Sequence, residues 1–294
     1  MKPARFDYVR AESIAHAVEA LAGAGGDGKV LAGGQSLMPM MNFRLVKPSV
    51  LVDINRIPDL DRITHEAGVL RLGALVRHRM TAEDGLVARH IPVLHAAMKH
   101  VAHLTVRNRG TFCGSVCHAD PAAEMPMMTL LLDGTVHIAS PRGDRTMAAR
   151  DFLVGSLSTA LEPDEMVVAV DLAIPADGTG WAFEEFSRRH GDYALAAVAV
   201  LMARADGRMR NVRIAMMGIA DTALRFADVE AALEGREGTP AAFDEAAALL
   251  QAAIQPNSDL NASADYRRHL AGALARRALA DAWKRAGETT GGTA

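Results

Sequence analysis

The sequence predicts an α+β protein with two domains, and three observations support this prediction. Short apolar runs of strand length alternate with helical patterns through the N-terminal part of the chain. The segment 175–180, Pro-Ala-Asp-Gly-Thr-Gly, interrupts this pattern and is typical of a domain boundary. Beyond it, strand-like runs come first and helical stretches follow, an order that favours a small α+β domain.

Composition narrows the class of protein. The chain has 294 residues, enough for one large domain or two ordinary ones, and 50% of them are hydrophobic and 23% charged. The net charge of −3 gives no global preference for nucleic acid or anionic membranes. No apolar run is long enough to span a bilayer, and the start of the sequence lacks the apolar core of a signal peptide. We therefore expect a cytoplasmic protein.

The first elements follow from periodicity and from turn residues. Residues 13–21 form an amphipathic pattern that predicts a helix, with Ser13 as its cap. Residues 23–28 are rich in glycine and end this helix, after which 29–32 and 50–54 are predicted strands. Residues 63–75 alternate around Glu-Ala-Gly, which predicts a hairpin.

The next part of the chain predicts both helices and strands. The helices are expected at 81–86, 92–102 and 121–132, and the strands at 136–139, 145–147 and 166–174. Asp120 precedes the third of these helices and is a natural cap, with Pro121 at the first helical position.

In the C-terminal domain, strands are expected at 194–203 and 209–218, joined by a turn with the sequence Ala-Asp-Gly. Helices follow at 226–233, 241–254 and 266–284. Residues 288–294 are rich in glycine and threonine and are expected to form a flexible tail.

Two glycine-bearing loops carry most of the functional information. The first runs from Leu31 to Leu37 (Leu-Ala-Gly-Gly-Gln-Ser-Leu) directly after a predicted strand, and the second runs from Thr111 to Ser115 (Thr-Phe-Cys-Gly-Ser). Glycine lets the backbone approach a ligand closely, and successive free N–H groups bind phosphate. Two such loops are suited to the two phosphates of a dinucleotide.

Residues 23–28 match the Gly-x-Gly-x-x-Gly pattern, but they do not have its context. A Rossmann fingerprint lies after a strand and before a helix, and here a helix precedes the glycines and a strand follows them. We interpret these residues as a loop that ends a helix.

Cys113, Cys117 and His118 suggest a metal or haem site only at first sight. The spacing Cys-x-x-x-Cys-His is one residue too long for covalent haem attachment. An iron–sulfur cluster normally needs four ligands, whereas the chain has 2 cysteines, and no second compact pair supports structural zinc. Two buried reduced thiols are the simplest interpretation, and no metal ligand is predicted.

Four stretches together resemble a known family: 30–37, 50–57 (Val-Leu-Val-Asp-Ile-Asn-Arg-Ile), 105–124 and 189–195 (Arg-His-Gly-Asp-Tyr-Ala-Leu). In this order they are similar to the FAD-binding medium subunit of molybdenum hydroxylases, the group of carbon monoxide, xanthine, nicotine and caffeine dehydrogenases. The resemblance covers nearly the whole chain.

The resemblance implies a specific domain organisation. An FAD-binding domain of the vanillyl-alcohol-oxidase (PCMH) type is expected over residues 1–177, with sub-domains at about 1–58 and 59–177. A C-terminal domain like that of the carbon monoxide dehydrogenase flavoprotein is expected over 178–287, with a three-stranded antiparallel sheet and helices.

It also implies which residues bind the cofactor. Those of the two loops are expected beside the pyrophosphate, Asp120 beside the ribityl or adenosine portion, Val167 near the flavin, and Tyr193 against the isoalloxazine ring. The full expected set is Ala32, Gly33, Gly34, Gln35, Ser36, Leu37, Thr111, Phe112, Cys113, Gly114, Ser115, Asp120, Val167 and Tyr193.

Some positions depart from the family pattern. Gln35 stands where many members have histidine, and Phe112 and Cys113 replace residues of a usual Thr-Ile-Gly-Gly loop. Many members carry a lysine just before the paired arginines, where this chain has Glu184 and Glu185. Any cofactor contact of that lysine cannot be transferred to this chain.

The function implied by the resemblance is electron transfer. FAD would take electrons from a small 2Fe–2S subunit, which receives them from a large molybdopterin subunit, and pass them to an external acceptor. No catalytic acid, base or nucleophile is expected in this chain, and a dimer of heterotrimers is the implied assembly. The alternatives are a flavin-binding scaffold without electron transfer and a stand-alone flavin oxidase.

Overall fold

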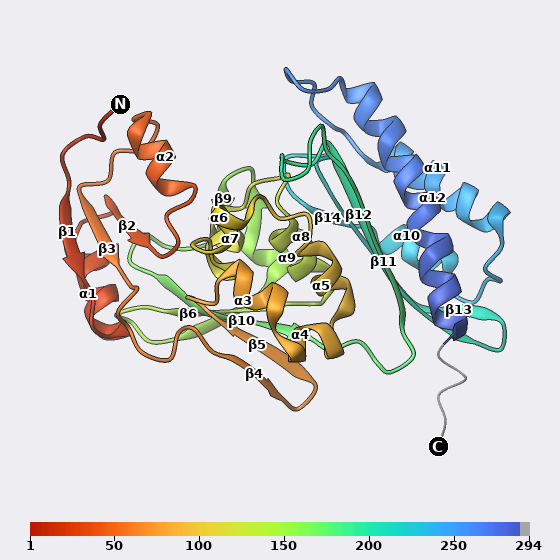
Figure 1. Cartoon of the computed structure of the whole chain (residues 1–294), viewed down its shortest axis with the longest axis horizontal. Coiled ribbons are helices and arrows are strands. Elements are labelled where there is room, and N and C mark those ends of the chain that lie inside the picture. Colours follow the sequence, from red (N-terminus) through yellow and green to blue (C-terminus); the bar gives the residue numbers. More distant parts are fainter. Residues whose placement is uncertain (289–294) are drawn as a thin grey trace. The chain divides into compact units, whose positions relative to one another are not determined.

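A computed structural model describes residues 1–288, which form two compact units (Figure 1). The first unit contains Met1–Leu86, His103–Ala119 and Asp133–Ala173. The second contains Val87–Ala102, Asp120–Leu132 and the chain from Ile174 onward. Each unit is therefore built from segments that are separated in the sequence. Positions 289–294 of the predicted tail lie outside the described residues.

A small parallel sheet begins the first unit. Its order is β1 (Asp7–Arg10), β3 (Val50–Asp53), β2 (Gly28–Leu31). Parallel neighbours need crossover connections, and helices α1 (Ile14–Gly23) and α2 (Leu37–Asn42) supply them. The Ser13 hydroxyl accepts a hydrogen bond from the His16 amide at 3.1 Å, so the predicted cap of α1 is confirmed.

The second sheet of this unit is antiparallel. Its order is β4 (Ile63–Glu66), β5 (Val69–Gly73), β10 (Met166–Ala173), β6 (Thr135–Ala139), β7 (Arg145–Ala148). The predicted hairpin is confirmed, because Ala67 and Gly68 connect β4 to β5 with φ of 49° and 77°. Val170 and Leu172, in the long central strand β10, are fully buried.

Short elements complete the first unit. They are α3 (His78–Glu83), α6 (Leu104–Arg107), α7 (Phe112–His118), α9 (Ala149–Phe152), β8 (Leu153–Gly155) and β9 (Ser158–Thr159). The helix predicted at 81–86 is wrong in its extent. Asp84 is extended and its carboxylate accepts the Leu86 amide at 2.8 Å, which ends α3 and starts α4 (Gly85–His90).

The second unit is a sheet covered by helices on both faces (Figure 1). Its strands are β11 (Gly180–Phe186), β12 (Ala196–Ala205), β13 (Arg208–Met217) and β14 (Leu224–Arg225), in that order. Helices α10 (Ala227–Leu233), α11 (Pro240–Ala253) and α12 (Ala264–Glu288) lie on one side, and α5 (Pro92–Ala97) and α8 (Glu124–Leu131) on the other. The expected three antiparallel strands are present, and the two-residue β14 adds a fourth.

The start of α8 differs from the prediction. Asp120 does not cap the helix: its carboxylate accepts the Ala122 amide at 2.9 Å in a turn that precedes the helix, and Ala123 occupies the cap position. The helix predicted at 92–102 ends at Ala97, followed by a turn in which Ala102 has φ of 40°. Within residues 1–288, no helix is long and apolar enough to cross a membrane.

Candidate cofactor-binding site

The first glycine loop leaves a row of backbone donors without protein acceptors. Residues 32–36 connect β2 to α2, and Gly34 has φ of 70°, a left-handed conformation that glycine adopts without strain. Within the described part of the chain, no carbonyl or side chain accepts a hydrogen bond from the amides of residues 33–37. None of these residues is buried. Such a row of accessible N–H groups is suited to an anionic ligand.

The second loop lies directly against the first at Gly33. A Cβ atom on Gly33 would lie 2.5 Å from the Arg109 carbonyl oxygen and 2.7 Å from the Gly110 Cα. Backbone atoms cannot rotate away as a side chain does, so glycine is required at this position. The structure therefore brings the Ala32–Leu37 loop together with the entrance of the second loop.

The amides of the second loop are used differently. Thr111 caps α7, because its hydroxyl accepts the Gly114 amide at 3.0 Å. The Phe112 amide donates to the Val76 carbonyl at 2.9 Å, and the Ser115 amide to the Thr111 carbonyl at 3.1 Å. These bonds hold the Thr111–Ser115 stretch in a fixed conformation and occupy three of its five amides, those of Phe112, Gly114 and Ser115.

The side chains of Phe112 and Cys113 point into the core. Phe112 is fully buried, and the Cys113 thiol lies 3.5 Å from the Leu72 carbonyl. Burial raises the pKa of Cys113 well above that of a free thiol, and it raises the pKa of Cys117 to about 12. Both cysteines are free thiols that stay protonated at neutral pH. In residues 1–288, no group of three or more His, Cys, Asp or Glu side chains is arranged to hold a metal ion.

A polar cavity of about 410 Å³ opens beside the first loop. Its wall includes Gly33, Gly34 and Gln35 from the loop, Asp53 at the end of β3 and Asn55 just after it, and Arg109 from the segment that leads into the second loop. The carboxyl ends of the parallel strands β2 and β3 meet here, which is where ligands commonly bind in sheets of this type.

Asp53 is the anionic member of this wall. Burial disfavours its charge, but hydrogen bonds from the Tyr8 hydroxyl and from the backbone and side-chain amides of Asn55 outweigh burial and lower its pKa. Asp53 and Asn55 lie in the stretch 50–57 that carries part of the family resemblance, but the resemblance does not assign them to the site. The available signal was the position of two polar residues directly after a buried parallel strand.

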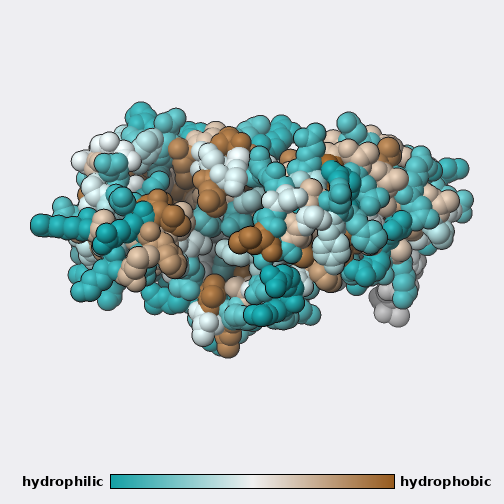
Figure 2. Space-filling view, turned by 90° about the horizontal axis from the view of Figure 1, so that it is seen from above, coloured by the Kyte–Doolittle hydropathy of each residue, from teal (hydrophilic) through white to brown (hydrophobic). Residues whose placement is uncertain are grey.

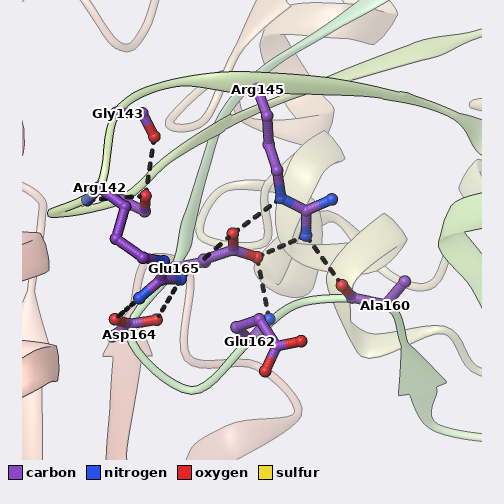
Figure 3. Close-up of polar contacts among 8 residues, drawn as sticks. Arg142, Gly143, Arg145, Ala160, Glu162, Asp164 and Glu165 are labelled. Carbon is purple, nitrogen blue, oxygen red and sulfur yellow. Dashed lines mark hydrogen bonds and ion pairs between the residues drawn. The ribbon is translucent and has the colours of Figure 1, made fainter.

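Val167 lies in the same unit, near the start of β10, and is buried. Two arginines fix the turn before this strand (Figure 3). Arg145 donates to both carboxylate oxygens of Glu165, at 2.7 and 2.6 Å, and Arg142 pairs with Asp164 in the same way. The backbone that carries Val167 therefore has a rigid support.

Asp120 and Tyr193 belong to the second unit. Asp120 is half-buried in its turn, while Tyr193 is 61% exposed in the connection between β11 and β12. Arg267 supports this connection, because its guanidinium donates to the Leu195 carbonyl at 2.7 Å and to the Asp259 carboxylate at 2.8 Å.

Glu185 is a buried acid of the second unit. Its side chain is 2% exposed, His100 Nδ1 lies 3.7 Å from its Oε1, and among the described residues none bonds its Oε2. Burial, and next the charge of Glu124, raises the pKa of Glu185 to about 8. Burial likewise raises the pKa of Glu124 to about 7.

Comparison with known protein families agrees with this architecture. Residues 4–176 match the FAD-binding domain in molybdopterin dehydrogenase, and residues 181–282 match the C-terminal domain of the carbon monoxide dehydrogenase flavoprotein.

Individual relatives match over almost their whole length. The chain is 40% identical to the 6-hydroxypseudooxynicotine dehydrogenase complex subunit alpha of Paenarthrobacter nicotinovorans, covering 98% of each chain. It is 38% identical to the carbon monoxide dehydrogenase medium chain of Hydrogenophaga pseudoflava, covering 97% of this chain and 99% of that one.

Solved structures show the same fold. A chain of the Hydrogenophaga pseudoflava carbon monoxide dehydrogenase that lacks the Mo-pyranopterin moiety superposes with a TM-score of 0.94 at 39% identity, covering 97% of this chain and 99% of that chain. A chain of quinoline 2-oxidoreductase from Pseudomonas putida 86 gives 0.93 at 39% identity, with the same coverage. This chain therefore belongs to the family of FAD-binding medium subunits of molybdenum hydroxylases.

Proposed function

We propose that this chain carries electrons through FAD from a 2Fe–2S partner subunit to an external acceptor. The observation that carries the proposal is the row of unbonded amides at residues 33–37, held against the second loop at Gly33. FAD supplies the redox chemistry when bound, and the protein supplies its position and its access to partners.

The residues present fit an FAD pyrophosphate. The accessible amides offer donors, and Arg109 adds a positive charge to the wall of the cavity. The carboxylate of Asp53 is turned to Tyr8 and Asn55, whose hydrogen bonds occupy it. We assign the pyrophosphate to the loop 32–37 and to the second loop at 111–115.

Two further assignments extend the site. Asp120 would lie beside the ribityl or adenosine portion and Val167 near the flavin. The two family matches support a division into an FAD-binding domain over residues 1–177, with sub-domains at about 1–58 and 59–177, and a C-terminal domain over 178–287. The separate parallel and antiparallel sheets support the two sub-domains.

Tyr193 is proposed to shield the isoalloxazine ring. Its exposed side chain on a well-supported connection fits this role. Tyr193→Ala should keep most FAD but change the rate at which oxygen or an artificial acceptor reoxidises it, as measured by stopped-flow absorbance. An unchanged rate would remove Tyr193 from the site.

The partners are inferred from the family. Relatives are named as subunits of dehydrogenase complexes, and one solved relative is described as lacking the Mo-pyranopterin moiety of its molybdenum cofactor. We propose a small 2Fe–2S subunit and a large molybdopterin subunit as partners, in a dimer of heterotrimers.

The direct test is the cofactor content of the purified chain. We expect one non-covalent FAD per chain, released into the supernatant by acid and identified by its absorbance and by chromatography. Absence of flavin would refute the proposed function, and flavin that stays with the precipitate would contradict non-covalent binding.

The two alternative functions predict different experimental results. A scaffold subunit would bind FAD that its reduced partners cannot reduce. A stand-alone oxidase would turn over a substrate without partners.

A further inference from the structure

Two side chains outside the glycine loops connect these loops to each other. Asn55 follows β3, and Arg77 precedes α3. A hydrogen bond from the Arg77 guanidinium to the Asn55 side-chain oxygen joins them. Neither side chain belongs to the loops, and both come from elements fixed in the core of the first unit.

Asn55 holds the first loop. Its side-chain NH₂ group donates to the Ala32 carbonyl at 2.9 Å and lies 3.4 Å from the Leu31 carbonyl. The same group donates to the Asp53 carboxylate at 2.6 Å, and the Asn55 backbone amide donates to it at 2.9 Å. A carboxylate only accepts and a guanidinium only donates, so the two neighbours fix the orientation of the Asn55 amide.

Arg77 holds the entrance of the second loop, at Arg109. One nitrogen of its guanidinium donates to the Arg109 carbonyl while another donates to Asn55. The backbone around Arg77 runs antiparallel to that around Thr111, with the His78 amide donating to the Gly110 carbonyl at 2.9 Å. Arg77 is half-buried, and its rigid planar fork reaches two acceptors at once, which a lysine ammonium on a flexible stem does not reproduce.

We propose that Asn55 and Arg77 are positioning residues that set the spacing between the two glycine loops for the pyrophosphate of the dinucleotide. The chain of bonds runs from the Ala32 carbonyl through Asn55 and Arg77 to the Arg109 carbonyl. It therefore joins the residue before Gly33 to the backbone group that Gly33 packs against. The inference rests on the proposed function, because it assigns the ligand of these loops to FAD.

The test uses the full chain freed of flavin and titrated with FAD and with ADP, which carries the pyrophosphate without the flavin. Arg77→Met and Asn55→Ala should each raise the Kd for both ligands by about tenfold or more. Arg77→Lys should give an intermediate loss, because lysine keeps the charge but loses the fork. Arg71→Met is the matched control, since Arg71 makes a bidentate pair with Asp171 in the same unit and outside the cavity.

The double variant separates positioning from general loosening. If Asn55 and Arg77 act through one connection, the double variant should bind FAD about as well as the weaker single variant. If the losses of FAD affinity in the two single variants multiply in the double variant, the two residues act independently and the proposed connection is wrong. The melting temperature of the flavin-free protein is measured alongside, and a loss of affinity that only follows a loss of folded protein would overturn a positioning role.

The positioning role and the proposed function predict different failures. If the unmodified chain binds FAD and the variants bind it as tightly as Arg71→Met does, the inference is wrong and the proposed function stands. If the unmodified chain binds neither FAD nor ADP, both are wrong. If Arg77→Met fails to fold, the FAD affinity of Arg77→Lys is compared with that of Arg71→Met in its place.

Discussion

Gly33 shows how a single residue can determine the geometry of the site. In the proposed site, glycine at this position lets the backbone of the loop approach phosphate closely. The structure adds a second reason: the Arg109 carbonyl and Gly110 occupy the space of a Cβ. Both reasons exclude any side chain.

We therefore expect Gly33→Ala to lower FAD occupancy at least tenfold and to destabilise the fold by about 1–3 kcal/mol through overpacking. The ratio of flavin to protein absorbance measures the first effect and thermal unfolding the second. Gly23→Ala is the matched control, because a Cβ on Gly23 would meet no atom within 4 Å. Full occupancy in Gly33→Ala would show that the loops can separate without loss of the site.

Glu185 makes the stability of the second unit depend on pH. A glutamate in an unfolded chain has a pKa near 4.5, and burial raises the folded pKa of Glu185 to about 8. Between these values the folded protein binds more protons than the unfolded chain, so the free energy of unfolding falls as the pH rises. Glu124, with its pKa raised to about 7, acts in the same direction. The pKa of nearby His100 is lowered by burial and next by the charge of His190, which disfavours a charged histidine beside Glu185.

Glu185→Gln keeps the shape of the protonated acid and cannot ionise. At pH 8.5 it should raise the free energy of unfolding by about 4 kcal/mol, since each unit by which the pKa is raised contributes about 1.4 kcal/mol, and at pH 5 it should change it by less than about 1 kcal/mol. Denaturant unfolding at both pH values measures this. Glu184→Gln is the control, since Glu184 pairs with Arg277 at 3.1 Å and is more exposed. A variant without a gain at high pH would show that Glu185 is stably ionised.

At the scale of elements, the periodicity of the sequence predicts most helices and strands, and tertiary contacts explain the exceptions. The sequence pattern does not predict strand β11, because Glu184 and Glu185 interrupt its apolar residues. Its pairing with β12 is what makes these residues extended. In α8, the turn held by Asp120 delays the start of the helix, and the Pro121 carbonyl instead accepts the Gly218 amide at 2.8 Å.

The junction of β11 and α12 gives a prediction at this scale. A Cβ on Gly180 would overlap the carbonyl oxygen of Ala282 and approach the Ala286 amide to 2.5 Å. Because these are backbone atoms of a helix, Gly180→Ala must displace the strand or the helix, and we expect a loss of about 2–4 kcal/mol in thermal unfolding.

Gly85→Ala provides the comparison, since a Cβ there meets no atom within 4 Å. It should change stability by less than about 0.5 kcal/mol. Equal effects of the two substitutions would mean that α12 adjusts freely against β11.

The sequence predicts the two glycine loops as a binding site but does not predict the residues that hold these loops in place. Loop residues are neighbours in sequence, so a local motif identifies them. Asn55, Arg77 and Arg109 meet only through the fold, and the first two are 22 positions apart in sequence. A single sequence offers no periodic or compositional signal for such a contact.

For the whole molecule, the exposed surface bears on assembly. Large apolar side chains are exposed on both units, among them Phe43, Leu45, Leu104, Val154 and Leu260. On the face seen in Figure 2, hydrophobic residues form small groups between hydrophilic ones. Scattered groups of this kind suit several limited contacts better than one continuous apolar interface.

The last prediction is that the chain functions only with partners. Its 2 cysteines cannot supply the four ligands of a typical iron–sulfur cluster, so under the proposed function electrons would reach FAD from another chain. Expressed alone, it should bind FAD and oxidise no N-heterocycle, aldehyde or carbon monoxide. Co-expressed with the products of neighbouring genes, it should co-purify at equal stoichiometry, and substrate should then bleach the flavin absorbance. A complex prepared with flavin-depleted medium subunit is the control, because substrate should still reduce its iron–sulfur centres while transfer to the acceptor stops. Substrate turnover by the isolated chain, or acceptor reduction at full rate without flavin, would refute electron transfer through this subunit.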